Sequence, residues 1–82
     1  MIIDRIEEEV HESRRNSGLY SSETFVYIDH VTFQKMIRQM GGEMEPRDIA
    51  LLHSHTINGA RYYLVEAPQE HGAKVFTIAK RD

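Results

Sequence analysis

The stretch Ile49–Ala67, IALLHSHTINGARYYLVEA, decides the fold that the sequence predicts. Near its middle lies Asn58-Gly59, a residue pair that tolerates the positive φ angles of a type I′ turn. The flanking residues include many β-branched and aromatic types, so the sequence predicts a hairpin of two strands, 49–57 and 60–67. The turn fixes the register, and the register assigns every side chain of the hairpin to one face.

The predicted register divides the hairpin into two faces. His55 is expected opposite Tyr62, and His53 is expected opposite Leu64. The more apolar face, and therefore the expected core face, comprises Leu51, His53, His55, Ile57, Ala60, Tyr62 and Leu64. The other face comprises Leu52, Ser54, Thr56, Arg61, Tyr63 and Val65. A slip of one residue would exchange the two sets, because successive side chains of a strand alternate.

Two other segments have the apolar spacing of amphipathic helices. Asp4 is a candidate N-cap for a helix over 4–15, whose narrow apolar stripe comprises Ile3, Ile6 and Val10. Asp29 is a candidate N-cap for a helix over 30–40, whose apolar stripe comprises Phe33, Met36, Ile37 and Met40. We expect the second helix to end at Gly41-Gly42.

Two further strands complete the predicted fold, over 23–28 and 74–79, and the element order becomes α-β-α-β-β-β. A crossover through the second helix can join the first two strands in parallel, and the last three strands are expected to form an antiparallel meander. We therefore expect one small α+β domain over residues 1–82. Its four-stranded, mostly antiparallel sheet carries both helices on one face, which leaves the other face uncovered.

The composition narrows the functional classes. The 82 residues include 10 basic and 13 acidic residues, for a net charge of −3, which disfavours a duplex-binding domain. The absence of cysteine excludes disulfides, thiolate nucleophiles and cysteine-based zinc sites, and it favours a cytoplasmic location. No apolar stretch is long enough to span a bilayer, so no membrane partner is expected.

The histidines of the hairpin are the only pattern that suggests chemistry. His53 and His55 share one face of the predicted strand, an arrangement that zinc sites use. A zinc site needs a third ligand, for which His71 is a candidate, as are Glu66 and His30. The favoured interpretation has no cofactor and places His53 and His55 half-buried at the sheet edge, bonded to backbone or to Tyr62. A pH-sensing role, with a response between about pH 5 and 7, is a further hypothesis for this pair.

Sequence motifs of enzymes are absent. The chain has no glycine-rich phosphate-binding loop, no Gly-x-Ser-x-Gly and no His-Glu-x-x-His. Ser54 lies between the two histidines, but on a strand it points to the opposite face from both. A small, cysteine-free chain without catalytic signatures is typical of accessory proteins, including many that bacteriophages encode.

The leading hypothesis is therefore a non-enzymatic module that binds another protein or associates with itself. The expected contact surfaces are the second hairpin face, with Arg61 and Tyr63, and the acidic first helix, with Glu8 and Glu12. A metal-dependent protein based on His53, His55 and His71 is the alternative. A third hypothesis is weak nucleic-acid binding through Lys35, Arg38 and Arg61, with Tyr62 and Tyr63 stacking on bases.

Overall fold

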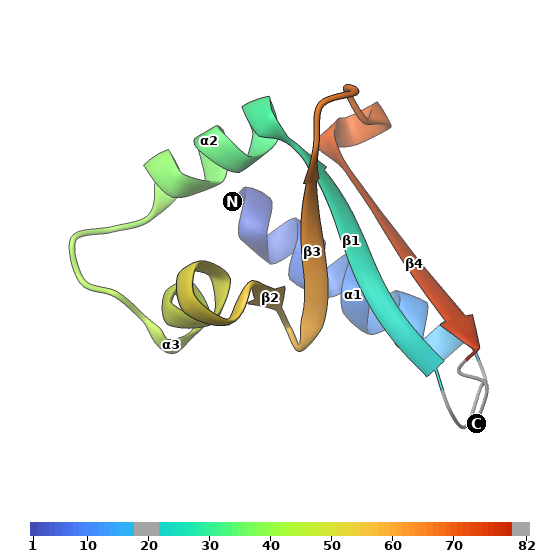
Figure 1. The fold of residues 1–82 in the computed structure, drawn as a ribbon. Helices are drawn as coiled ribbons and strands as arrows, with labels where there is room; N and C mark the ends of the chain where they lie inside the picture. Colours follow the sequence, from blue (N-terminus) through green and yellow to red (C-terminus); the bar gives the residue numbers. More distant parts are fainter. Residues whose placement is uncertain (18–21, 80–82) are drawn as a thin grey trace.

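The structure is a computed structural model that describes residues 1–17 and 22–79. It contains a four-stranded mixed sheet with helices packed against it (Figure 1). Of Ser22 and Ala79 only the backbone is described. The elements are α1 (Ile2–Ser17), β1 (Ser22–Asp29), α2 (His30–Gln39), α3 (Pro46–Ile49), a π-helix (Ala50–Ser54), β2 (Thr56–Ile57), β3 (Ala60–Val65), a 3₁₀ turn (Glu70–Gly72) and β4 (Ala73–Ala79). The α+β class is confirmed. Within the described ranges, no helix is long and apolar enough to cross a membrane.

The strands are ordered β2-β3-β1-β4, so β1 lies inside the sheet. It pairs in parallel with β3 and antiparallel with β4, whereas β2 pairs antiparallel with β3. The expected meander of the last three strands is therefore wrong, because β1 separates β3 from β4. Figure 1 shows the chain passing over the end of β1 between these two strands. The physical reason is that β1 carries apolar side chains on both faces, which favours an interior position.

The hairpin prediction is right at the turn and wrong before it. Asn58 and Gly59 have φ angles of 51° and 79°, and Ile57 pairs with Ala60 across the turn. The segment 46–54, however, is helical, and β2 is only two residues long. Helix formation starts at Pro46, whose fixed φ suits the first turn, and the Asp48 carboxylate accepts a hydrogen bond from the Glu45 backbone N–H (2.9 Å).

The core lies between one face of the sheet and the helices. It comprises Ile3, Ile6 and Val10 of α1, Met36 of α2, Leu51 of the π-helix, and Val26, Ile28, Ile57, Ala60, Tyr62 and Ala73 of the sheet. Both predicted helices thus contribute to one core. Leu64 was also expected there but is 42% exposed. The chain before Thr56 turns away into the π-helix, so β2 pairs only with Ala60 and Arg61 and does not extend beside Leu64.

Asp29 joins three parts of the fold at the end of β1. Its side chain caps α2 by accepting a hydrogen bond from the Thr32 backbone N–H (2.8 Å), and it also accepts one from Gln69 N–H (3.1 Å). Hydrogen bonds from Thr32, followed by the one from Gln69, hold the pKa of Asp29 below its ordinary value of 3.8. The buried carboxylate therefore favours the folded state when it is ionised.

We expect Asp29→Ala to lower the free energy of unfolding by about 1–2 kcal/mol at pH 7, because the cap and its second hydrogen bond are lost. The folded-state pKa is lowered, so the contribution is present above pH 3.8 and is lost as the pH falls through the folded-state value. Urea denaturation of both proteins at several pH values measures this difference. A difference that stays constant down to pH 2 would contradict the role of the ionised carboxylate.

Gly72 is the position where the backbone admits no side chain. Its φ is +84°, and a Cβ atom there would lie 2.2 Å from the Thr32 hydroxyl oxygen at the start of α2. We expect Gly72→Ala to destabilise the fold by about 2 kcal/mol or more, since it combines a left-handed backbone with a steric clash. Gly41→Ala is the matched control, because no atom lies within 4 Å of its Cβ position. Urea midpoints that move equally in the two variants would refute this explanation.

Candidate functional site

Four aromatic rings lie together on the face of the sheet that points away from the core. This open aromatic face comprises Phe25 and Tyr27 of β1, Tyr63 of β3 and Phe76 of β4. Alternation along β1 explains its position: Val26 and Ile28 are fully buried against the helices, so Phe25 and Tyr27 point the other way. The pairing of Phe25 with Phe76, and of Tyr27 with Tyr63, brings the rings together.

Four of the five ring pairs pack edge to face, and the fifth, Phe25 with Tyr27, is tilted by 31°. The ring centres of Phe25 and Phe76 are 5.0 Å apart at 86°, and those of Tyr27 and Phe76 are 4.8 Å apart at 89°. Such contacts contribute about 0.5–1.5 kcal/mol per pair beyond simple burial. They hold the rings in a fixed arrangement, yet Tyr27 and Tyr63 remain 38% and 48% exposed. The face is therefore ordered and still accessible to solvent.

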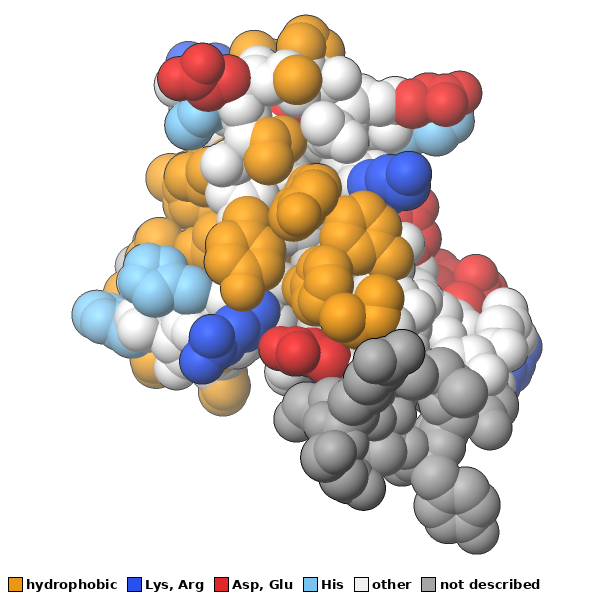
Figure 2. Space-filling model, turned by 45° about the vertical axis from the view of Figure 1, so that its right-hand side comes forward, with side chains coloured by type: hydrophobic (Ala, Val, Ile, Leu, Met, Phe, Trp, Pro, Cys, Tyr) orange, Lys and Arg blue, Asp and Glu red, His pale blue; other side chains and the backbone are white. Residues whose placement is uncertain are grey.

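Charged side chains surround the open aromatic face. Arg61 pairs with Phe25 in the sheet register, and the Lys74 ammonium lies 5.7 Å from the centre of the Phe76 ring. Glu23 precedes the rings on β1 and pairs with Ile78, which is 50% exposed. Figure 2 shows hydrophobic side chains gathered in the centre of this view, with basic groups on two sides and acidic groups below. In residues 1–17 and 22–79, no ion pair involves Glu23, Arg61 or Lys74.

Of the contact residues expected from sequence, Arg61 and Tyr63 lie where the hairpin register places them, on the outer face of β3. Glu8 and Glu12 are exposed on α1, which packs on the opposite face of the sheet. Lys35 and Arg38 are exposed on α2, which contributes Met36 to the core on that same opposite face. The structure therefore does not bring Lys35 and Arg38 together with Arg61 in one basic patch.

The histidines do not share a strand face. His53 belongs to the π-helix, His55 follows it in a left-handed conformation (φ 54°), and both are exposed. His71 lies in the 3₁₀ turn that precedes β4, also with a positive φ. The shared-face prediction is wrong because the helix that starts at Pro46 extends to Ser54. In the part of the chain that the structure describes, no three His, Cys, Asp or Glu residues are grouped for a metal ion.

Other expectations for the histidines have mixed outcomes. His55 does face Tyr62, with 3.4 Å between Nδ1 and the phenol oxygen. The proposed third ligands His30 and Glu66 line a cavity of about 350 Å³ beside the start of α2, and neither His53 nor His55 lines this cavity. Ser54 ends the π-helix, so its expected strand orientation does not apply.

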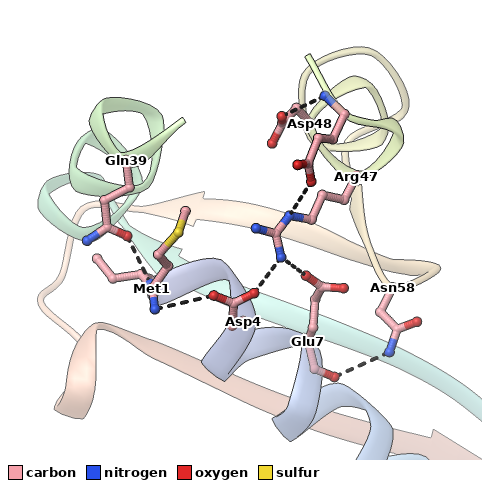
Figure 3. Close-up of polar contacts among 9 residues, drawn as sticks. Met1, Asp4, Glu7, Gln39, Arg47, Asp48 and Asn58 are labelled. Atoms are coloured by element: carbon pink, nitrogen blue, oxygen red, sulfur yellow. Dashed lines mark hydrogen bonds and ion pairs between the residues drawn. The ribbon is translucent and has the colours of Figure 1, made fainter. Parts of the chain in front are cut away.

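A cluster of ion pairs joins α3 to α1 (Figure 3). The Arg47 guanidinium contacts the carboxylates of Asp4 and Glu7, the latter at 3.2 Å, and lies 3.6 Å from Glu45. The hydrogen bond with Arg47, and then that with the N-terminal amine, lowers the pKa of Asp4, and Asp4 in turn raises the pKa of Arg47. The opposite charges pair with one another, which assigns the cluster a structural role, although the buried Arg47 Nε makes no hydrogen bond within the described residues.

Only part of this cluster is predictable from the sequence. Asp4 and Glu7 are three residues apart, so they share one side of a helix. The expected role of Asp4 as the N-cap is wrong, because α1 begins at Ile2 and Asp4 lies in its first turn. Arg47 is 40 or more residues away in sequence, so no local pattern connects it with either carboxylate.

In comparisons of the chain with protein-family models, with curated proteins and with solved structures, no match was found.

The neighbouring residues Tyr62 and Tyr63 provide a test of the two sheet faces. The buried Tyr62 donates a hydrogen bond from its hydroxyl to the Leu51 carbonyl oxygen (2.5 Å), and burial raises its pKa. We expect Tyr62→Phe to lower the free energy of unfolding by about 1–2 kcal/mol, since it leaves the Leu51 carbonyl without this donor. Tyr63→Phe is the control and should change stability by less than about 0.5 kcal/mol. Equal losses in urea denaturation would contradict the assignment of faces.

Proposed function

We propose that this chain is a non-enzymatic protein-binding module and that the open aromatic face is its binding surface. One observation carries the proposal: Phe25, Tyr27, Tyr63 and Phe76 form an ordered aromatic cluster on the uncovered side of the sheet. Two of these rings and the neighbouring Ile78 are between 38% and 50% exposed. Contiguous apolar surface of this kind on a small soluble protein commonly marks an interaction site.

The composition of the surface also supports protein binding. Interfaces between proteins are enriched in aromatic residues and arginine, and they typically have an apolar centre with a polar rim. Here the rings form the centre, and Glu23, Arg61 and Lys74 lie around them. Because the site is built on three paired strands rather than on loops, little ordering is required when a partner binds.

The ring orientations favour a protein over a single-stranded nucleic acid. Phe25 and Tyr27 are tilted by only 31° to each other, whereas Tyr63 is at 80° to both of them. Rings at such different angles cannot all present their flat faces to one stack of bases. Nucleic-acid binding also requires basic charge, and the expected basic set is divided between opposite faces of the sheet.

The metal-dependent alternative loses its main support, because it depended on a strand face shared by His53 and His55.

We propose a cytoplasmic location for the module. Proteins of the reducing cytoplasm rarely contain disulfides, and this chain has no cysteine that could form one. Binding to another surface also suits a domain of this size, since a small core leaves limited stability on its own.

Site-specific photo-crosslinking in the producing cells tests the proposal. A benzophenone amino acid is placed at Tyr63 in one protein and, as the control, at Val31, an apolar residue of α2 that is 63% exposed. We expect a discrete protein adduct from position 63 and none from position 31. The mass of the adduct, compared with twice the 9.6 kDa of the chain, separates self-association from a different partner. Absence of an adduct at position 63, or equal adducts at both positions, would contradict the proposal.

A further inference from the structure

We propose that the partner of the open aromatic face is a second copy of this chain. The two copies form a two-fold dimer with their sheets face to face, and Glu23 of each copy pairs with Lys74 of the other. This inference rests on the proposed function, because it names the protein that the aromatic face binds.

The sheet register supplies the geometry. Phe25 and Phe76 are paired at the middle of the face. Glu23 lies two residues from Phe25 towards one end of the strands, and Lys74 lies two residues from Phe76 towards the other end. Consider a two-fold axis that lies midway between the two sheets, parallel to them, and crosses the strands at the Phe25–Phe76 pair. Rotation about this axis exchanges the two ends of the strands, so it brings Glu23 of one copy opposite Lys74 of the other.

The same axis produces ordinary sheet packing. Glu23 and Lys74 belong to adjacent strands, so the axis must be tilted slightly from the perpendicular to the strands. Such a tilt makes the strands of the two sheets cross at a small angle, as in aligned packing, where the angle is about 30°. Face-to-face sheets lie about 10 Å apart, a gap that extended glutamate and lysine side chains bridge from opposite sides.

The charges on the face meet the requirement for a symmetric interface. In a two-fold dimer the same surface supplies both members of every contact, so it must be complementary to itself. The rings meet this condition by packing on one another across the axis. The rim also meets it, because it carries the acid Glu23 and the bases Lys74 and Arg61, none of them ion-paired within residues 1–17 and 22–79.

Charge reversal tests the inference directly. We expect the wild-type chain to sediment as a dimer, and Glu23→Lys and Lys74→Glu each to raise the dimer dissociation constant about tenfold or more, because each homodimer then opposes like charges. An equimolar mixture of the two variants should recover dimerisation, since both contacts in the heterodimer are again of opposite sign. The double variant Glu23→Lys, Lys74→Glu should also recover it. Analytical ultracentrifugation at low salt measures all four proteins and the mixture.

Two matched controls and a fold check complete the experiment. Arg15→Glu on α1 and Glu43→Lys between α2 and α3 reverse exposed charges outside the open aromatic face and should leave the dissociation constant unchanged. Circular dichroism checks that each variant is folded, and recovery in the mixture excludes misfolding as the cause of a loss.

The outcomes separate this inference from the proposed function. A wild-type chain that stays monomeric at millimolar concentration overturns the inference, and a position-63 adduct with another protein would then leave the proposed function standing. A dimer that is unaffected by either single variant, or a mixture that fails to recover, overturns the Glu23–Lys74 arrangement. A monomer that also forms no adduct overturns both.

Discussion

The interior position of β1 is the constraint on which the other features depend. This strand has neighbours on both sides, so its two faces must both be accommodated by the fold. Val26 and Ile28 are fully buried against the helices, and alternation then forces Phe25 and Tyr27 to the opposite face. Pairing with β3 and β4 adds Tyr63 and Phe76 to them. The core and the candidate binding surface are therefore two consequences of the same strand.

The end of β1 fixes the surroundings of that strand. One buried carboxylate, Asp29, caps α2 and also binds the connection between β3 and β4 through Gln69. Gly72 then allows the chain to pass close to Thr32 before it enters β4. Since β4 provides Phe76 and Lys74, the packing at this end of the sheet helps to determine where these two side chains lie on the open aromatic face.

The charged residues divide into two groups with different roles. Arg47 pairs with carboxylates of α1 and with the N-cap residue that precedes its own helix, so this cluster contributes to the attachment of α3. Around the aromatic rings, by contrast, Glu23, Arg61 and Lys74 form no ion pairs in the described ranges. Charges of this kind beside exposed apolar surface would contribute chiefly to specificity and orientation if a partner bound there.

The sequence alone determined the features that depend on near neighbours: the stripe of Ile3, Ile6 and Val10, the cap at Asp29 and the turn at Asn58-Gly59. It also placed Arg61 and Tyr63 together on one side of β3. It did not reveal the helix over 46–54, although Pro46 and Asp48 carried a signal for it, because the apolar run that follows suits a strand as well. Only the tertiary structure decided that β1 lies between β3 and β4 and that Phe25, Tyr27, Tyr63 and Phe76 meet. The choice of strand neighbours depends on burial across the whole chain, which no local pattern records.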